Sequence, residues 1–233
     1  MISIVIPCFN EEEVIVDSIK EVQQWMLKNK CEGEILVVNN KSTDSTVEKI
    51  HNLVDQQYVL LLDEYIKGKG AAVKKGLQNC KFDKVLILDA DLSTDINEFN
   101  PDWLSKKNYH LLIGSRSLGK EINTPIKRVL AGKVFNFIVR KMFKIDIKDT
   151  QCGFKYLHSD KIQKISERLT FSGFSFDVDL IEACKEIGLE IQEVPIKYIF
   201  NKNSSVSLII DSIIMLRDLV KIRRKYKNDY FKR

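Results

Sequence analysis

The stretch Lys84-Val85-Leu86-Ile87-Leu88-Asp89-Ala90-Asp91 decides the fold prediction. Its short apolar run is rich in Val, Ile and Leu, which is typical of a strand buried on both faces in a parallel sheet. Two carboxylates, one residue apart, follow directly. Because sheets of this kind bind ligands at the carboxyl ends of their strands, the stretch predicts a buried strand that ends in a ligand site.

Similar apolar runs alternate with helical patterns on either side. Strands are predicted at 2–7, 34–38, 58–62, 84–88 and 110–114, and helices at 12–27, 44–53, 70–79 and 95–107. Such alternation is typical of βαβ units, so we expect an α/β fold, Rossmann-like, with a mostly parallel sheet flanked by helices. The second half is less regular, with predicted helices at 124–143, 177–187 and 207–225, a strand at 190–194, and a loop with a strand over 149–156. We expect one domain, 1–205, and a basic amphipathic extension, 206–233.

Asp89 and Asp91 suit a hard divalent cation. Mg2+ and Mn2+ prefer oxygen ligands, and they often bridge a protein carboxylate to a diphosphate. A metal here would offset the charge on a departing nucleoside diphosphate. The alternative is an ordinary Asp-rich turn at a strand end.

Further motifs follow one another in a recognisable order. They are VIPCFNEE at 5–12, VVNNKSTDST at 37–46, KGKGAA at 67–72, DAD at 89–91, GSR at 114–116, DTQCGFK at 149–155, FDVDL at 176–180 and EVP at 193–195. Together they resemble glycosyltransferase family 2, whose members are inverting enzymes with the GT-A fold. The second half is similar to the dolichyl- and polyprenyl-phosphate glucose and mannose synthases, and DTQCGFK favours the glucose synthases. The resemblance covers about 220 residues.

The resemblance implies a nucleotide-sugar site built mainly from the first half of the chain. The implied donor-binding residues are Pro7, Phe9, Asn10, Glu11, Asn39, Asn40, Lys69, Asp89 and Ala90, with Mg2+ or Mn2+ on Asp89 and Asp91. Asn39-Asn40 stands where the family commonly has Asp-Asp, one of which accepts a hydrogen bond from the base. An amide oxygen can also accept, but without charge assistance, so uridine and guanosine both stay open. The glycines of the KGKG segment would let backbone N–H groups approach phosphate.

Catalytic and acceptor-binding roles are implied for a second set of residues. These are Asp91, Arg116, Arg128, Asp149, Asp177 and Lys202. Arg116 would contact the donor phosphate, and Arg128 and Lys202 would bind the acceptor phosphate. An ionised lipid phosphate needs cationic positioning rather than a general base. Asp177 would therefore be a base only for a hydroxyl acceptor, and Asp149 either orients a basic residue or caps a turn.

The charge distribution points to a membrane surface. The net charge is +5, yet the 17 residues from Arg217 onward carry +6 and the rest of the chain carries −1. A local basic segment favours an anionic membrane surface over general nucleic-acid binding. Apolar residues mix with cations over 126–143 and 208–226, which predicts two amphipathic surface helices, with core packing as the alternative. No run reaches the ~18 apolar residues of a membrane span, so we expect peripheral attachment or docking to a membrane-embedded partner protein.

The resemblance, together with the charge distribution, implies a hexosyltransferase at the cytoplasmic face of a membrane. The donor would be UDP-glucose first and GDP-mannose second, and the acceptor a polyprenyl or dolichyl phosphate. Five widely spaced cysteines, an odd number, favour a reducing compartment over a disulfide framework. The alternatives are a family 2 transferase acting on a glycan hydroxyl, a sugar-1-phosphate nucleotidyltransferase, and a non-catalytic nucleotide-binding protein.

Overall fold

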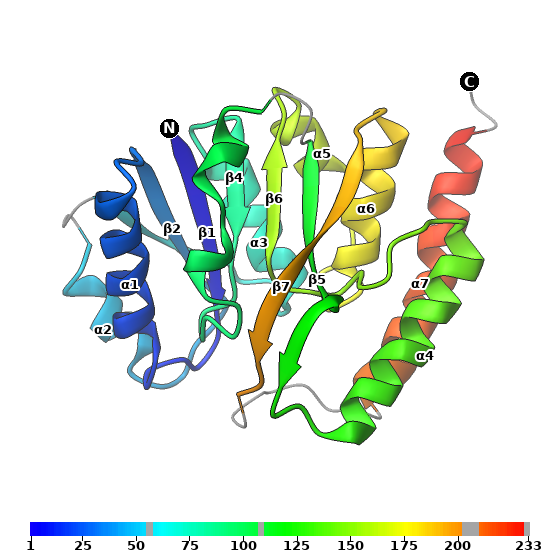
Figure 1. Ribbon diagram of the computed structural model, residues 1–233, viewed down its shortest axis with the longest axis horizontal. Coiled ribbons are helices and arrows are strands. Elements are labelled where there is room, and N and C mark those ends of the chain that lie inside the picture. Colours follow the sequence, from blue (N-terminus) through cyan, green and yellow to red (C-terminus); the bar gives the residue numbers. More distant parts are fainter. Residues whose placement is uncertain (55–57, 107–109, 202–209, 231–233) are drawn as a thin grey trace.

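A single mixed sheet is the framework of the molecule (Figure 1). The computed structural model describes residues 1–54, 58–106, 110–201 and 210–230. The strands are β1 (Ile2–Cys8), β2 (Gly33–Asn39), β3 (Val59–Asp63), β4 (Lys84–Ile87), β5 (Leu111–Ile122), β6 (Lys155–His158) and β7 (Ile191–Ile199), in the order β3-β2-β1-β4-β6-β5-β7. Neighbouring strands run parallel except where β6 pairs with β4 and β5. The prediction of a mostly parallel sheet is confirmed.

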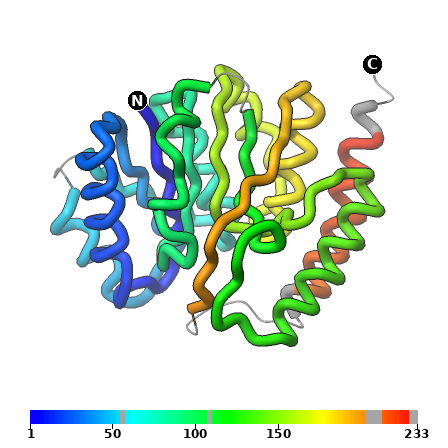
Figure 2. Tube along the Cα trace, in the orientation of Figure 1, coloured from blue at the N-terminus to red at the C-terminus, as the bar shows by residue number. Residues whose placement is uncertain are grey.

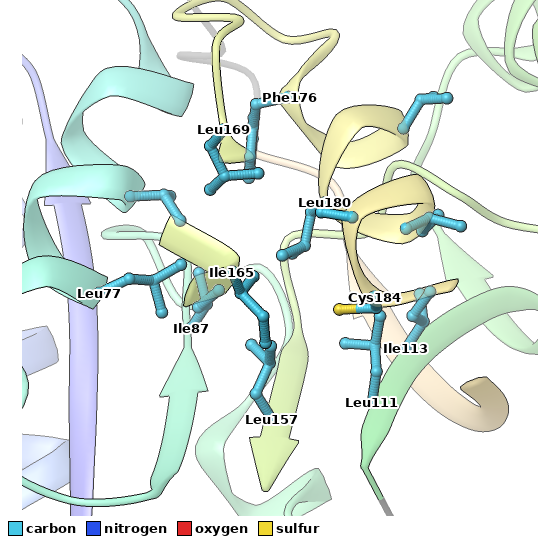
Figure 3. Close-up of a cluster of buried hydrophobic side chains, with 14 of the residues drawn as sticks. Leu77, Ile87, Leu111, Ile113, Leu157, Ile165, Leu169, Phe176, Leu180 and Cys184 are labelled. Carbon is cyan, nitrogen blue, oxygen red and sulfur yellow. The ribbon is translucent and has the colours of Figure 1, made fainter. Parts of the chain in front are cut away.

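Helices cover both faces of this sheet. They are α1 (Ile15–Lys28), α2 (Thr46–His51), α3 (Lys69–Asn79), α4 (Ile126–Phe143), α5 (Ile162–Arg168), α6 (Phe176–Glu186) and α7 (Ile210–Tyr230). Side chains alternate along β1, so Val5 joins one buried apolar cluster while Ile4 and Ile6 join another on the opposite face. Figure 3 shows part of the first cluster, in which Leu77 and Ile165 lie over the strands. The α/β fold class is confirmed.

The strand ends bring the first-half motifs to one edge of the sheet. All of β1 is buried, and it pairs with β2 in register as far as Cys8 opposite Asn39. On its other side β1 pairs with β4, where Val5 lies opposite Ile87. The segments that follow these three parallel strands therefore emerge together, as the sequence predicts.

The second half of the sheet is built by insertion. The chain leaves β5, forms α4 and returns as β6 between β4 and β5. Both β5 and β7 are longer than the predicted strands, and they pair with each other beyond a register shift between Ser115 and Lys120. This two-strand extension stands beside the edge where the parallel strands end (Figure 1).

One predicted helix, at 95–107, is wrong. The structure has two 3-10 turns there, η1 (Ile96–Glu98) and η2 (Pro101–Leu104). The side chains of Asp95 and Asn100 accept hydrogen bonds from backbone N–H groups two residues ahead, at 2.7 and 2.9 Å. Such local bonds compete with a continuous helix, and Pro101 removes one backbone donor. The helix α5 was not predicted.

The last helix packs against the body of the protein. On its inner side Met215, Leu219, Ile222 and Tyr226 are buried, whereas Ile213 and other outward residues are exposed. Figures 1 and 2 show α7 beside α4 at one edge of the molecule, with both helices starting near the edge where the parallel strands end. The predicted domain boundary at 205/206 falls within 202–209, outside the described residues, and stays a prediction.

Candidate active site

A cleft of about 440 Å3 opens where the parallel strands end. Most of the residues expected to act in the site line it. They are Pro7, Phe9, Glu11, Asn40, Lys69, Asp89, Ala90, Asp91, Arg116, Arg128, Asp149 and Asp177. Asn10, which is exposed, and Asn39, which is buried, do not line it, and Lys202 lies outside the described residues.

Carboxylates from two neighbouring strand ends line the same cleft: Asp89 and Asp91 follow β4, and Glu11 follows β1. Asp89 forms an ion pair with Lys69, and Asp91 accepts hydrogen bonds from the Ser93 N–H and hydroxyl at 3.0 and 2.6 Å. Burial raises the pKa of Glu11 to about 7, and the negative charges of Asp91 and Asp89 add to this rise. Burial would also raise the pKa of Asp89, but Lys69 holds it below its ordinary value. The site therefore concentrates negative charge that a cation would stabilise.

A divalent cation fits this donor set when the substrate supplies further ligands. In the described part of the chain, no three His, Cys, Asp or Glu side chains converge to hold a metal by themselves. Mg2+ commonly binds through one or two carboxylates plus substrate phosphates. Asp89 and Asp91 offer that pair of carboxylates on the cleft wall.

The DTQCGFK segment packs directly against the metal-binding candidate. A Cβ atom on Gly153 would lie 1.9 Å from Oδ2 of Asp89, so any larger residue here would displace the Asp89 carboxylate. Nearby, the fully buried Lys155 donates to the Cys152 carbonyl and to Asp177, each at 2.5 Å. Burial raises the pKa of Asp177, and Lys155 opposes that rise.

Sequence reasoning missed the role of Lys155. Lys155 lies within the predicted loop and strand over 149–156, among the apolar Cys152, Phe154 and Tyr156. A lysine in such surroundings is unusual, because burying an ammonium group without a partner is costly. That anomaly was the available signal. In the structure Lys155 ties the DTQCGFK segment to the first turn of α6 through Asp177.

Arg116 is held by a two-pronged ion pair. Its Nε and Nη2 donate to Asp149 at 2.7 and 2.8 Å, and its backbone N–H donates to the same carboxylate at 3.0 Å. Asp149 is 1% exposed, and burial alone would raise the pKa of its carboxyl group. The ion pair with Arg116 instead holds that pKa below its ordinary value. The Arg116 guanidinium also lies 5.2 Å from the centre of the Tyr198 ring. Of the two roles expected for Asp149, this geometry favours orienting a basic residue.

The Asn39-Asn40 pair shapes a loop. Asn40 donates to the carbonyls of Glu64 and Ile66, and its oxygen accepts from the Gly68 N–H at 2.6 Å. Asn39 accepts from the Ser42 N–H at 3.0 Å and donates to Asp63 at 2.8 Å. The amides therefore secure the segment that leads into α3.

The glycines at the start of α3 allow close packing. A Cβ on Gly68 would lie 2.3 Å from the Ser172 carbonyl oxygen, and one on Gly70 would lie 2.4 Å from that of Phe171. The Gly68 N–H donates to the Asn40 side chain, so it does not point toward a phosphate as the sequence predicts for the backbone N–H groups of this segment. The Lys69 side chain, in contrast, does reach the carboxylates of the cleft.

Arg128 stands in the first turn of α4, on the cleft wall. Its guanidinium carbon lies 5.2 Å from the centre of the Phe200 ring, next to the end of β7. The cleft thus has carboxylates at the end of β4 and two arginines contributed by the second half of the chain.

Comparison with known proteins places this arrangement in a family. The family model described as glycosyl transferase family 2 matches residues 3–166. A dolichyl-phosphate beta-glucosyltransferase of Dictyostelium discoideum is 28% identical over 243 residues, which cover 97% of this chain and 74% of that protein. The Saccharomyces cerevisiae protein of the same name is 30% identical over 255 residues, covering 97% and 75%.

A solved structure agrees in fold. Glucosyl-3-phosphoglycerate synthase from Mycobacterium tuberculosis, crystallised with Mn2+, UDP-glucose and phosphoglyceric acid, matches with a TM-score of 0.72 at 16% identity. The match covers 96% of this chain and 79% of that chain. The chain therefore belongs to glycosyltransferase family 2, has the GT-A fold and is a hexosyltransferase.

Proposed function

We propose that this protein transfers glucose from UDP-glucose to a polyprenyl or dolichyl phosphate at the cytoplasmic face of a membrane. The observation that carries the proposal is the single cleft in which the Asp89 and Asp91 carboxylates share the walls with Arg116 and Arg128. Carboxylates with a divalent cation suit a nucleoside diphosphate, and arginines suit a second phosphate group. The relatives named as dolichyl-phosphate beta-glucosyltransferases support glucose as the transferred sugar and dolichyl phosphate as the acceptor.

On the donor side, Asp89 and Asp91 would hold Mg2+ or Mn2+, which neutralises charge on the departing nucleoside diphosphate. Lys69, paired with Asp89, adds positive charge at the same place. Pro7, Phe9 and Glu11 line the part of the cleft that follows β1, where the nucleotide would lie. The solved neighbour that contains Mn2+ and UDP-glucose supports this assignment.

On the acceptor side, Arg128 would bind the lipid phosphate and Arg116 would orient the two phosphate groups. An acceptor phosphate oxygen then forms the bond to the anomeric carbon while the bond from that carbon to the diphosphate breaks. Because a phosphate is already ionised, no protein base is needed. Asp177 fits this picture, since its carboxylate is occupied by the buried Lys155.

The surface beside the cleft suits contact with a bilayer. Along α4, Ile126, Leu130, Val134 and Phe137 are exposed and recur on one side of the helix. On α7 Ile213 and Ile214 are exposed as well. Among the described residues, no helix is both long and apolar enough to cross a membrane. Peripheral attachment, with or without a membrane-embedded partner protein, would bring the cleft to the acceptor.

The test is transfer of radiolabelled glucose into a solvent-extractable lipid. We expect label from UDP-glucose to enter polyprenyl phosphate with Mg2+ or Mn2+ present, and GDP-mannose to be a poorer donor. Label that enters only a water-soluble glycan would support the second candidate, a transferase acting on a hydroxyl. In that candidate Asp177 is the base, and its raised pKa is the observation in favour. No transfer from any nucleotide sugar to polyprenyl phosphate would refute the proposal.

A further inference from the structure

The first half of α4 overhangs the cleft. Every buried residue of this helix lies in its second half: Phe135, Asn136, Val139 and Phe143. None of residues 126–134 is buried. Yet Val129, Ala131 and Gly132 line the cleft from this overhanging part, so its inner side faces the cleft instead of the core.

The part of the cleft beneath this overhang has a partly apolar lining. From α7, Ser212 and Met215 line it, and Phe135 and Phe174 add two aromatic rings. The same cleft contains Arg128 one helical turn before Gly132, and the carboxylates at the end of β4. A phosphate held at Arg128 would therefore lie next to the part of the cleft between α4 and α7, a passage whose lining is partly apolar.

Gly132 has no packing reason to be glycine. A glycine inside a helix destabilises it relative to alanine, because its backbone is more flexible when unfolded. At Gly70 and Gly153 an added Cβ would collide with neighbouring atoms, but at Gly132 nothing lies within 4 Å of it. The missing side chain leaves open space on the cleft wall.

The outward side of the same half of α4 is apolar. Ile126, Leu130 and Val134 are 85, 62 and 53% exposed on the same half of α4 that lines the cleft. Hydrocarbon that reaches this outward side of α4 would contact these side chains instead of water, which is favourable.

We infer that Gly132 keeps open a passage between α4 and α7 for the branched hydrocarbon next to the acceptor phosphate, and so determines how bulky that hydrocarbon can be. The inference rests on the proposed function, since it concerns the lipid part of the same acceptor. Gly132 touches no reacting atom in this account; it is a specificity-determining residue.

The test compares Gly132→Leu with the matched control Gly132→Ala, using two acceptors in detergent. One is a branched isoprenoid phosphate and the other is an unbranched alkyl phosphate of similar length. Leucine should block the passage for methyl-branched chains, so kcat/KM for the branched acceptor should fall about tenfold or more relative to that for the linear one. Alanine, which meets no neighbour, should leave this ratio unchanged.

Two further measurements separate the possible results. Affinity for UDP with Mn2+ should match the wild type in both variants, and the melting temperature should not fall below that of the wild type, because alanine and leucine favour a helix more than glycine does. These results would show that the fold and the donor site are intact. An unchanged branched-to-linear ratio in a folded Gly132→Leu protein would overturn the inference while leaving the proposed function in place. Equal losses with both acceptors would also overturn it, because a general structural effect does not discriminate chain shape. A wild-type protein that glycosylates neither acceptor would instead overturn the proposed function.

Discussion

The two halves of the sheet build the walls of one cleft by different means. In the parallel half, β3-β2-β1-β4, strand register brings the ends of the strands to one edge, and the motifs after β1 and β4 line the cleft. In the mixed half, ion pairs between residues far apart in sequence hold the charged groups. Arg116 is paired with Asp149, and Lys155 with Asp177.

This difference predicts different weaknesses. A change at a strand end in the parallel half should remove chemistry and leave the fold intact, because the neighbouring backbone is held by the sheet. A change in the mixed half should weaken the fold and the site together, because the same ion pair supports both. The following predictions test this contrast.

The largest effect is expected at Asp91. Asp91→Asn should lower turnover a hundredfold or more, about 3 kcal/mol of barrier, because a neutral amide holds the cation poorly. The melting temperature should hardly change, since the asparagine oxygen can still accept from Ser93. Asp83→Asn, at the exposed opposite end of β4, is the matched control and should keep full activity. Full wild-type activity in EDTA would contradict the metal assignment.

The second prediction concerns the ion pair between Arg116 and Asp149 in the mixed half. Asp149→Asn leaves the guanidinium without its counter-charge and should lower the free energy of unfolding by about 2–3 kcal/mol, less than for a fully buried pair because Arg116 is partly exposed. Activity should fall with it. Asp146→Asn is the control: its pair with Arg140 has the same 2.7 Å separation, but the Asp146 side chain is 89% exposed. That change should cost under about 1 kcal/mol in urea unfolding. Equal losses in the two variants would remove the contrast between the halves.

The parallel half was also the easier one to predict. Its strands follow from apolar runs, and the place of Asp89 and Asp91 follows from the general position of ligands at strand ends. The sequence does not predict that β6 runs antiparallel to its neighbours. A strand of four residues can pair in either direction, and the choice depends on partners that are distant in sequence. For the same reason the sequence does not identify the ion-pair partners of Asp149 and Asp177. Family membership removes the nucleotidyltransferase and non-catalytic alternatives, whereas the acceptor stays a proposal.

The third prediction concerns pH and the carboxylates of the parallel half. Glu11 has an ordinary pKa of 4.5 when unfolded and about 7 when folded, so the folded state binds more protons between these values. The free energy of unfolding should therefore fall as pH rises from 4.5 to 7, by about 1–2 kcal/mol after allowance for solvent screening, and then level off. Glu11→Gln should remove most of this fall. Mn2+ should reduce it in the wild type, because a cation favours the ionised form. A wild-type profile that matches the variant in chelator would contradict the raised pKa.

The smallest effect is expected on the outer surface of the mixed half, at α7. Truncating the helix after Leu216 is unsuitable, because it would remove the buried Leu219, Ile222 and Tyr226 from the core. Point changes at exposed cations avoid this problem. Arg217 and Arg224 are exposed and share one side of α7 with the exposed Ile213 and Val220, at the spacing i, i+4, i+7, i+11.

A helix side with this mixture suits the surface of an anionic bilayer, where a cation contributes about 1 kcal/mol. Each of Arg217→Gln and Arg224→Gln should therefore weaken binding to anionic vesicles about fivefold in a sedimentation assay, with no change on neutral vesicles. Raised salt should shrink the difference, because it screens exposed charges. Lys20→Gln and Lys28→Gln remove the same charge from exposed positions on α1, at the far edge of the sheet (Figure 1), and should have no such effect. If the α1 changes weakened binding equally, net charge alone would explain it, and α7 would not be the membrane-facing side.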